Sequence, residues 1–309
     1  MRLETDVVNP ETSSVHWNKV TVVGVGLLGG SLGLALRQRG LANSVAGYVR
    51  RAASIVECEK AGAVTYATRD LAKAVNGADL IVLCTPLGQM RQLIEQMAGS
   101  IKPGAIVTDV GSVKGIVVDS LEKQVAKAGG HFIGSHPMAG AEKTGVSAAR
   151  ADLFVEAVCV ITPTAKSNRA AIKQVESLWK AIGARVLKLA PKIHDQFVSR
   201  SSHLPHMVAA TLANLVLHPG HPKEQTMLCA NGFRDTTRIA SGSPEMWRDI
   251  ALTNRKYISQ ALLAFSRQLQ KLHKLISAGD SRGIERFLTE TKLLRDGWQQ
   301  TGATSRNDE

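Results

Sequence analysis

The stretch VTVVGVGLLG, residues 20–29, decides the fold, because an apolar run leads directly into a G-x-G-x-x-G turn. The small and apolar residues 29–36 then predict the first turns of a helix. In such a unit Gly24 permits the tight turn, Gly26 lets the backbone approach a pyrophosphate, and Gly29 lets the helix pack close to the strand. The helix N-terminus then faces the negative charge; the alternative is a turn that binds no ligand. The residues expected to bind a dinucleotide are Gly24, Gly26, Leu28 and Gly29.

The second strand of this unit narrows the choice of cofactor. Residues 44–49 form the next apolar run, which ends about 20 residues past the turn, where an acidic residue would hold the ribose 2′-hydroxyl of NAD. This chain has Val49 there, followed by Arg50 and Arg51. Guanidinium groups suit a bidentate contact with a 2′-phosphate. The two arginines therefore favour NADP over NAD, although arginines on a solvated loop would give the same sequence.

The composition is that of a globular chain long enough for two domains. Its 309 residues are 44% hydrophobic and 21% charged, which argues against disorder. The formal net charge of +12 calls for a partner of opposite sign. Aromatic residues make up only 4%, the basic residues are spread out, and no nucleic-acid motif stands out. An anionic cofactor and an acidic substrate account for the charge equally well, so charge alone does not choose the partner.

The cysteines and the absence of long apolar segments indicate the compartment. Cys58, Cys84, Cys159 and Cys229 are far apart and form no C-x-x-C pair. This pattern favours reduced thiols over a disulfide framework or a zinc site. No run of 18 or more uncharged apolar residues occurs, and residues 1–6 lack the apolar core of a signal sequence. We therefore expect a cytoplasmic protein with no membrane span and no metal.

Strand and helix patterns alternate up to residue 190, and only helical patterns follow. The alternation predicts an α/β fold with a doubly wound, mainly parallel sheet of the Rossmann type. The amphipathic segments beyond it predict an all-helical second domain, whose apolar faces could bury against a second copy and so favour a homodimer. The expected partition is a flexible extension over 1–17, a dinucleotide-binding domain over 18–190, a helical substrate and dimerisation domain over 191–300, and an unstructured tail over 301–309.

Three polar motifs follow predicted strands, where a doubly wound sheet binds its ligand. Thr85 and Pro86 end one strand and are expected to line the cofactor site. The string DVGSVK, which contains Ser112, ends the next strand, and GSHPMAG, which contains His136, ends the one after. The histidine and the serine would then act as a base and its orienting partner. The alternatives are a buried, hydrogen-bonded histidine and a serine that caps the following helix.

The helical region holds two further clusters. SSHLPH at residues 201–206 has two histidines three positions apart, the spacing of half a metal site, but no matching carboxylate or cysteine pair supports a metal. Pro205 would also open the helix locally. NGFRDTTRIA at residues 231–240 carries two arginines four positions apart, which on an isolated helix would be an ordinary solvated face.

Together these strings are more specific than any one alone, and the chain resembles the prephenate/arogenate dehydrogenase family. The resemblance runs in order from residue 18 to residue 298. It implies oxidative decarboxylation of prephenate to 4-hydroxyphenylpyruvate, or of arogenate to tyrosine, in tyrosine biosynthesis, with a small dicarboxylate substrate and no nucleic-acid or membrane partner. The strings that carry it are the turn at 24–29, DVGSVK at 109–114, GSHPMAG at 134–140, His194-Asp195, SHLPH at 202–206, GFRDTTRIA at 232–240 and Met246-Trp247.

The resemblance also implies a role for individual residues. His136 matches the catalytic histidine, which bonds the 4-hydroxyl of the substrate ring and takes its proton as hydride leaves C4. Ser112 matches the serine that supports this hydroxyl and the histidine. Arg238 matches the arginine expected on a substrate carboxylate, and His206 matches the histidine near the substrate side chain. The acidic residue usual after the second strand is missing, which puts a preference for NAD in doubt. The remaining pocket positions are Ser202, Asn231 and Trp247.

Two other functions fit parts of the pattern. A β-hydroxyacid dehydrogenase shares a nucleotide domain and a helical domain, but its G-x-x-G-x-G-x-x-x-K-x-x-N string is absent. A redox sensor that binds NADP without turnover would tend to lose its proton-handling residues, yet Ser112, His136 and Arg238 are all present. We therefore expect a dehydrogenase that uses NAD or NADP.

Overall fold

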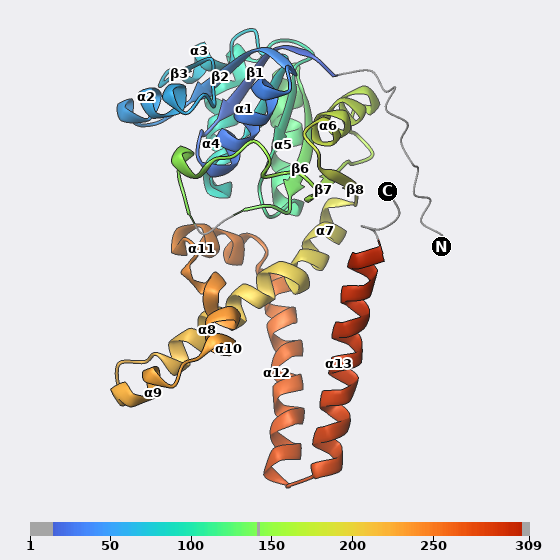
Figure 1. Cartoon of the computed structure of the whole chain (residues 1–309). Helices are drawn as coiled ribbons and strands as arrows, with labels where there is room; N and C mark the ends of the chain where they lie inside the picture. The colour runs from blue at the N-terminus through green and yellow to red at the C-terminus, as the bar shows by residue number, and fades with distance from the viewer. Residues whose placement is uncertain (1–14, 141–142, 305–309) are drawn as a thin grey trace. The chain divides into compact units, whose positions relative to one another are not determined.

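The computed structural model describes residues 15–140 and 143–304. An eight-stranded sheet runs through the first compact part of the described chain, which ends at Arg255 (Figure 1). Its strand order is β3-β2-β1-β4-β5-β6-β7-β8, and neighbouring strands are parallel except for the antiparallel pair β6 and β7. The strands are β1 (Trp17–Val23), β2 (Ala42–Tyr48), β3 (Tyr66–Thr68), β4 (Leu80–Leu83), β5 (Ile106–Asp109), β6 (His131–Pro137), β7 (Val158–Thr162) and β8 (Arg185–Lys188).

Apolar side chains cover both faces of this sheet, as strands buried on two sides require. One cluster packs under α1, α2 and α6 around Trp179, and a second packs under α3, α4 and α5 around Leu121. These are the two helix layers of a doubly wound fold, so the predicted fold class is confirmed (Figure 1). The helices are α1 (Leu27–Gln38), α2 (Ala52–Lys60), α3 (Leu71–Val75), α4 (Leu87–Met97), α5 (Gly115–Lys127) and α6 (Arg169–Ala181).

The direction of winding reverses between β1 and β4. From β1 the chain moves outward to β2 and β3, and then returns to lay β4 along the other side of β1. Open α/β sheets bind ligands outside the carboxyl ends of the strands at such a point. The loops that start there are the glycine turn after Val23 and the Thr85-Pro86 segment after Leu83.

Beyond β8 every described element is helical, as the sequence predicts. A π-helical turn, Ser199–His203, joins the first two of these helices. Pro205 explains it, because a residue without an N–H cannot complete the regular ladder. The elements up to Thr253 are α7 (Pro191–Val198), α8 (Leu204–Val216), α9 (Lys223–Met227), α10 (Asn231–Thr237), the 3₁₀ turn η4 (Arg238–Ser241) and α11 (Pro244–Thr253).

Two long helices, α12 (Arg255–Ser277) and α13 (Ser281–Thr304), make up most of the second compact part. Because α13 continues to Thr304, the unstructured tail predicted from residue 301 is wrong over its first residues, and residues 305–309 lie outside the described chain. At the other end β1 already includes Trp17, and residues 1–14 of the predicted extension are also outside it. None of the described helices is long and apolar enough to cross a membrane.

Candidate active site

The glycine turn brings β1, β4 and α1 into close contact. Gly24 has a φ of +98°, and a Cβ there would lie 2.8 Å from the carbonyl oxygen of Cys84. A Cβ on Gly29 would collide with the carbonyl oxygen of Gly24, so only glycine allows α1 to approach the strand this closely. Apart from the chain neighbours of Gly26, no atom of the described residues lies within 4 Å of its Cβ position. The backbone is therefore open at the place where the sequence predicts a pyrophosphate.

A cavity of about 490 Å³ lies over this turn. Gly26 caps α1 without a side chain, so the first N–H groups of the helix have no capping partner from that residue. Leu28 does not line the cavity, because its side chain packs against the core beneath α1. The predicted cofactor residues that do line it are Gly24, Gly26, Arg50, Arg51, Thr85 and Pro86.

Three arginines gather beside this cavity. Arg50 and Arg51 are exposed directly after β2, and Arg51 forms a 3.7 Å ion pair with Glu57. Arg69, which follows β3, donates from Nε to the backbone carbonyl oxygen of Arg50 at 3.1 Å. The sequence does not predict Arg69 at this cavity, because only the pairing of β2 with β3 brings it close to Arg50.

His136 lies inside β6, where it is paired with Val160 of β7. The sequence predicts that a strand ends within GSHPMAG, and β6 does end there, at Pro137, after antiparallel pairing with β7 has carried it past His136. The side chain is only 6% exposed. Its Nδ1 lies 2.8 Å from Nε2 of His194, and the two rings meet edge to face.

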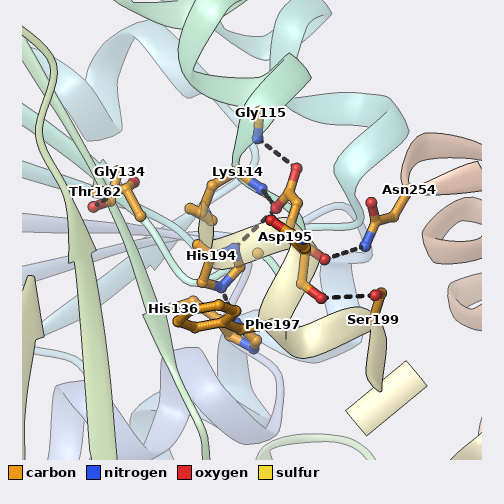
Figure 2. Close-up of polar contacts among 12 residues, drawn as sticks. Lys114, Gly115, Gly134, His136, Thr162, His194, Asp195, Phe197, Ser199 and Asn254 are labelled. Atoms are coloured by element: carbon orange, nitrogen blue, oxygen red, sulfur yellow. Dashed lines mark hydrogen bonds and ion pairs between the residues drawn. The ribbon is translucent and has the colours of Figure 1, made fainter. Parts of the chain in front are cut away.

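His194 and Asp195 are consecutive buried residues of α7 (Figure 2). Nδ1 of His194 lies 2.8 Å from Oδ1 of Asp195. The same carboxylate accepts the backbone N–H groups of Lys114 at 2.7 Å and Gly115 at 2.8 Å, where α5 begins. Asn254 donates to the main-chain carbonyl oxygen of Asp195 at 3.0 Å. A continuous polar chain therefore joins the start of α5 to His136.

Lys114 is a fully buried cation near this chain. Its ammonium pairs with the carboxylate of Asp109 at the end of β5 and donates to the carbonyl oxygen of Ser135 at 2.8 Å. The Asp109 carboxylate also accepts the backbone N–H groups of Gly111 at 2.9 Å and Ser135 at 3.1 Å. A buried charge requires such partners, and here they tie β5 to the segment of β6 that carries His136.

Ser112 is half-buried in the loop between β5 and α5. The residue at the N-cap of α5 is Lys114, so the interpretation of Ser112 as a helix cap is wrong. Within the described residues no hydrogen bond joins Ser112 to His136. The side chain within hydrogen-bonding distance of Nδ1 of His136 is that of His194.

A second group of rings lies on the helices. His206 stacks on Trp247 with ring centroids 3.5 Å apart and planes 10° from parallel. His203 meets the same indole edge-on at 6.1 Å, and its Nδ1 lies 3.2 Å from the side-chain nitrogen of Asn254. A Cβ on Gly242 would lie 2.7 Å from Nε1 of Trp247, so glycine makes room for the indole.

The remaining predicted pocket residues lie around this group. Asn231 begins α10 and Arg238 begins η4, and both elements pack against α8, which carries His206. Asn231 and Arg238 are exposed, whereas Ser202 is half-buried in the π-helical turn before α8. The fold therefore gathers these four side chains on neighbouring helical elements.

Burial keeps the histidines of this region neutral. Burial is the main cause that holds the pKa of His136 well below its usual value, and the charges of His194 and Lys114 add to it. Burial also lowers the pKa of His203 to about 4, and lowers the pKa values of His194 and His206. A neutral imidazole at His136 has a lone pair with which to accept a proton.

Three of the buried polar residues, Lys114, His194 and Asp195, belong to the strings that carry the family resemblance, but their sequence predicts no role for them. Their signal was the adjacency of a histidine and an aspartate, and a lysine five residues after an aspartate. Neither pattern predicts that these side chains are buried. Burial matters because a charged side chain inside a protein needs charged or hydrogen-bonding partners. Among the described residues, no group of three His, Cys, Asp or Glu could hold a metal ion.

Comparison with known proteins agrees with this geometry. A family model described as prephenate dehydrogenase, nucleotide-binding domain, matches residues 32–188. A second, described as prephenate dehydrogenase, dimerization domain, matches residues 190–290. The prephenate dehydrogenase of Bacillus subtilis is 34% identical over 284 residues, which cover 90% of this chain and 75% of that protein.

Solved structures give the same result. The crystal structure of prephenate dehydrogenase from Aquifex aeolicus, in complex with hydroxyphenyl propionate and NAD⁺, is 32% identical with a TM-score of 0.86, covering 92% of this chain and 99% of that one. The Synechocystis arogenate dehydrogenase is 32% identical with a TM-score of 0.75, covering 91% and 99%. Identity above 30% over nine tenths of the sequence, with both domain models matched in order, means that this chain belongs to the prephenate dehydrogenase family.

Proposed function

We propose that this oxidoreductase converts prephenate to 4-hydroxyphenylpyruvate and CO₂ with transfer of a hydride to NAD(P)⁺, or arogenate to tyrosine by the same chemistry. The observation that carries the proposal is His136, a buried and neutral imidazole whose Nε2 has no hydrogen bond within the described residues. A neutral imidazole with a free lone pair on Nε2 can act as the proton acceptor of the reaction. The Aquifex aeolicus relative, solved with NAD⁺ and a hydroxyphenyl acid, supports the assignment.

In this reaction the proton leaves the oxygen of the ring 4-hydroxyl, and the hydride leaves C4, the carbon that carries this hydroxyl. His136 accepts the proton of the ring 4-hydroxyl at Nε2 as the hydride leaves C4. The bound nicotinamide supplies the hydride acceptor. The electrons of the broken bond to CO₂ enter the ring, which becomes aromatic, and the phenolate oxygen takes the proton back from His136. A positioned acid–base group of this kind contributes about 10²- to 10⁴-fold to the rate.

The substrate carboxylates need cationic or hydrogen-bonding partners. We assign one carboxylate to Arg238, because an arginine binds a carboxylate through two parallel N–H groups. His206, held flat on Trp247, would contact the substrate side chain. Ser202 and Asn231 complete the pocket as lesser contacts. The net charge of +12 would help to draw a dianion towards such a site.

For the cofactor we propose a preference for NADP. Arg50 and Arg51 stand where a 2′-phosphate would lie, and Arg69 adds a third guanidinium group. Ser54 lines the same cavity and offers a hydroxyl. Val49 lines the cavity at the position of the usual acidic residue, and its side chain has no polar atom with which to hold a ribose 2′-hydroxyl.

We also propose that the protein is a homodimer through its helical region. Large apolar side chains on α12 and α13 are exposed, more than a monomer would leave in water. The match to a dimerization domain over residues 190–290 supports a second copy as their partner. Light scattering should then give twice the chain mass of 33.1 kDa. The exposed residues are Leu262, Leu263, Leu269, Ile276, Leu288, Leu293 and Leu294.

A spectrophotometric assay that crosses prephenate and arogenate with NAD⁺ and NADP⁺ tests the function and the cofactor together. Appearance of reduced nicotinamide with either substrate, accompanied by release of CO₂, is the expected result. The substrate with the higher kcat/KM identifies the activity, and NADP⁺ should give the lower KM of the two cofactors. Absence of turnover in all four combinations would reject the proposed function.

A further inference from the structure

A line of three buried side chains runs from α7 to the sheet: Asp195, His194 and His136 (Figure 2). Asp195 lies at one end, and its carboxylate accepts the backbone N–H groups of Lys114 and Gly115. The ring nitrogen Nδ1 of His194 lies 2.8 Å from Oδ1 of the same carboxylate. A carboxylate in this position accepts hydrogen bonds and has none to donate. The Nδ1 atom of His194 must therefore carry a hydrogen.

The position of this hydrogen determines which ring nitrogens of His194 and His136 donate and which accept. Burial lowers the pKa of His194, so the ring is neutral and carries a single N–H. With that hydrogen on Nδ1, Nε2 of His194 is an acceptor. Nε2 lies 2.8 Å from Nδ1 of His136, which must then be the donor. A neutral His136 with its hydrogen on Nδ1 has its free lone pair on Nε2.

We propose that His194 and Asp195 are positioning residues that hold His136 in the Nδ1–H tautomer, so that Nε2 is the atom that accepts the substrate proton. The inference rests on the proposed function for the identity of that proton. When Nε2 takes it, His136 becomes an imidazolium, and its Nδ1–H bond to His194 becomes charge-assisted. Asp195 then supplies a negative charge on the far side of His194.

The other ionisable side chains near His136 do not supply the negative charge that we assign to Asp195. Lys114 is paired with Asp109, so the pair carries no net charge. His203 is neutral because burial lowers its pKa to about 4. Asp195 is therefore the carboxylate that is linked to His136 through a hydrogen-bonded ring.

Two substitutions of His194 separate an orienting role from simple packing. His194→Gln can offer its amide oxygen to Nδ1 of His136 in place of Nε2. His194→Asn has a shorter side chain that reaches Asp195 but not His136. Both remove the imidazole, so they serve as matched variants, and thermal unfolding of each checks that it is folded.

The closing experiment is NMR of the free full-length enzyme with ¹⁵N-labelled histidine, in the wild type and both variants. We expect His136 to show a protonated Nδ1 and an unprotonated Nε2 in the wild type and in His194→Gln, and a mixture of tautomers in His194→Asn. We expect His194→Asn to lower kcat by about 10-fold or more, with KM within about twofold, and His194→Gln to retain more of kcat.

A wild-type His136 protonated on Nε2 would overturn the proposal. Equal kcat values for the two folded variants would overturn it as well. Because the tautomer is measured without substrate, the NMR result is independent of the proposed reaction. Failure of the proposed function would appear instead as absence of turnover in the wild-type enzyme with every combination of substrate and cofactor.

Discussion

His206 lies flat on the indole of Trp247, with ring centroids 3.5 Å apart and planes 10° from parallel. The indole thus sets the plane of a histidine that we assign to the substrate. Trp247→Leu removes the flat surface, and we expect KM for the substrate to rise by about 5-fold, the scale of an aromatic pair worth about 1 kcal/mol. Trp247→Phe keeps a ring and should raise KM less. Initial-rate kinetics measure both, and equal KM values would contradict the role.

Substitution of His136 by Asn should remove the proton acceptor. We expect kcat to fall by about 10²- to 10⁴-fold, the range for a positioned acid–base group, with substrate binding mostly kept. Calorimetric titration of substrate into the variant checks the binding. Unchanged turnover would show that another group takes the proton.

Arg238→Gln should act mainly on substrate affinity, because it removes a charge-assisted contact to a carboxylate. Such a contact is worth about 1.5–3 kcal/mol, which corresponds to a rise in KM of about 10- to 100-fold. Arg234→Gln is the matched control, since Arg234 is an exposed arginine on the preceding turn of helix. If both variants, or neither, raised KM, Arg238 would have no special role.

Arg50→Ala should weaken the binding of NADPH more than that of NADH. A guanidinium–phosphate contact worth about 1.5–3 kcal/mol predicts a loss of about 10- to 100-fold for NADPH alone. Lys123→Ala removes one exposed positive charge from α5 and controls for net charge. Fluorescence titration gives the dissociation constants. Equal losses for the two cofactors would remove the case for NADP.

His203 should make stability depend on pH. Burial lowers its folded-state pKa from 6.5 to about 4, so the unfolded chain binds more protons between these values. Its contribution to stability is therefore complete above pH 6.5 and is lost as the pH falls towards 4. His203→Gln should reduce the slope of unfolding free energy against pH by about 1.4 kcal/mol per unit in this range. Urea unfolding at several pH values measures the slope, and identical slopes would refute the prediction.

Short sequence patterns predicted the fold because strand burial, tight turns and helix interruptions depend on residues that are close together in the chain. The apolar strands and the G-x-G-x-x-G turn predicted the sheet and α1, since burial and a positive φ act on neighbouring residues. Pro205 likewise predicted a disturbed helix, which is a π-helical turn. The antiparallel pairing that carries β6 past His136 was missed, because β7 follows more than 20 residues later.

The sequence alone determined the order of the elements, the glycine turn after β1 and the histidine to which we assign the chemistry, because a short run of residues identifies each of them. Tertiary structure alone decided which groups surround that histidine. Within the described residues no hydrogen bond joins Ser112 to His136, whereas Nε2 of His194, 58 residues further along the chain, lies 2.8 Å from Nδ1 of His136. Hydrogen bonds and burial depend on position in space. The packing of α7 against α5 and β7 places the His194-Asp195 pair beside His136.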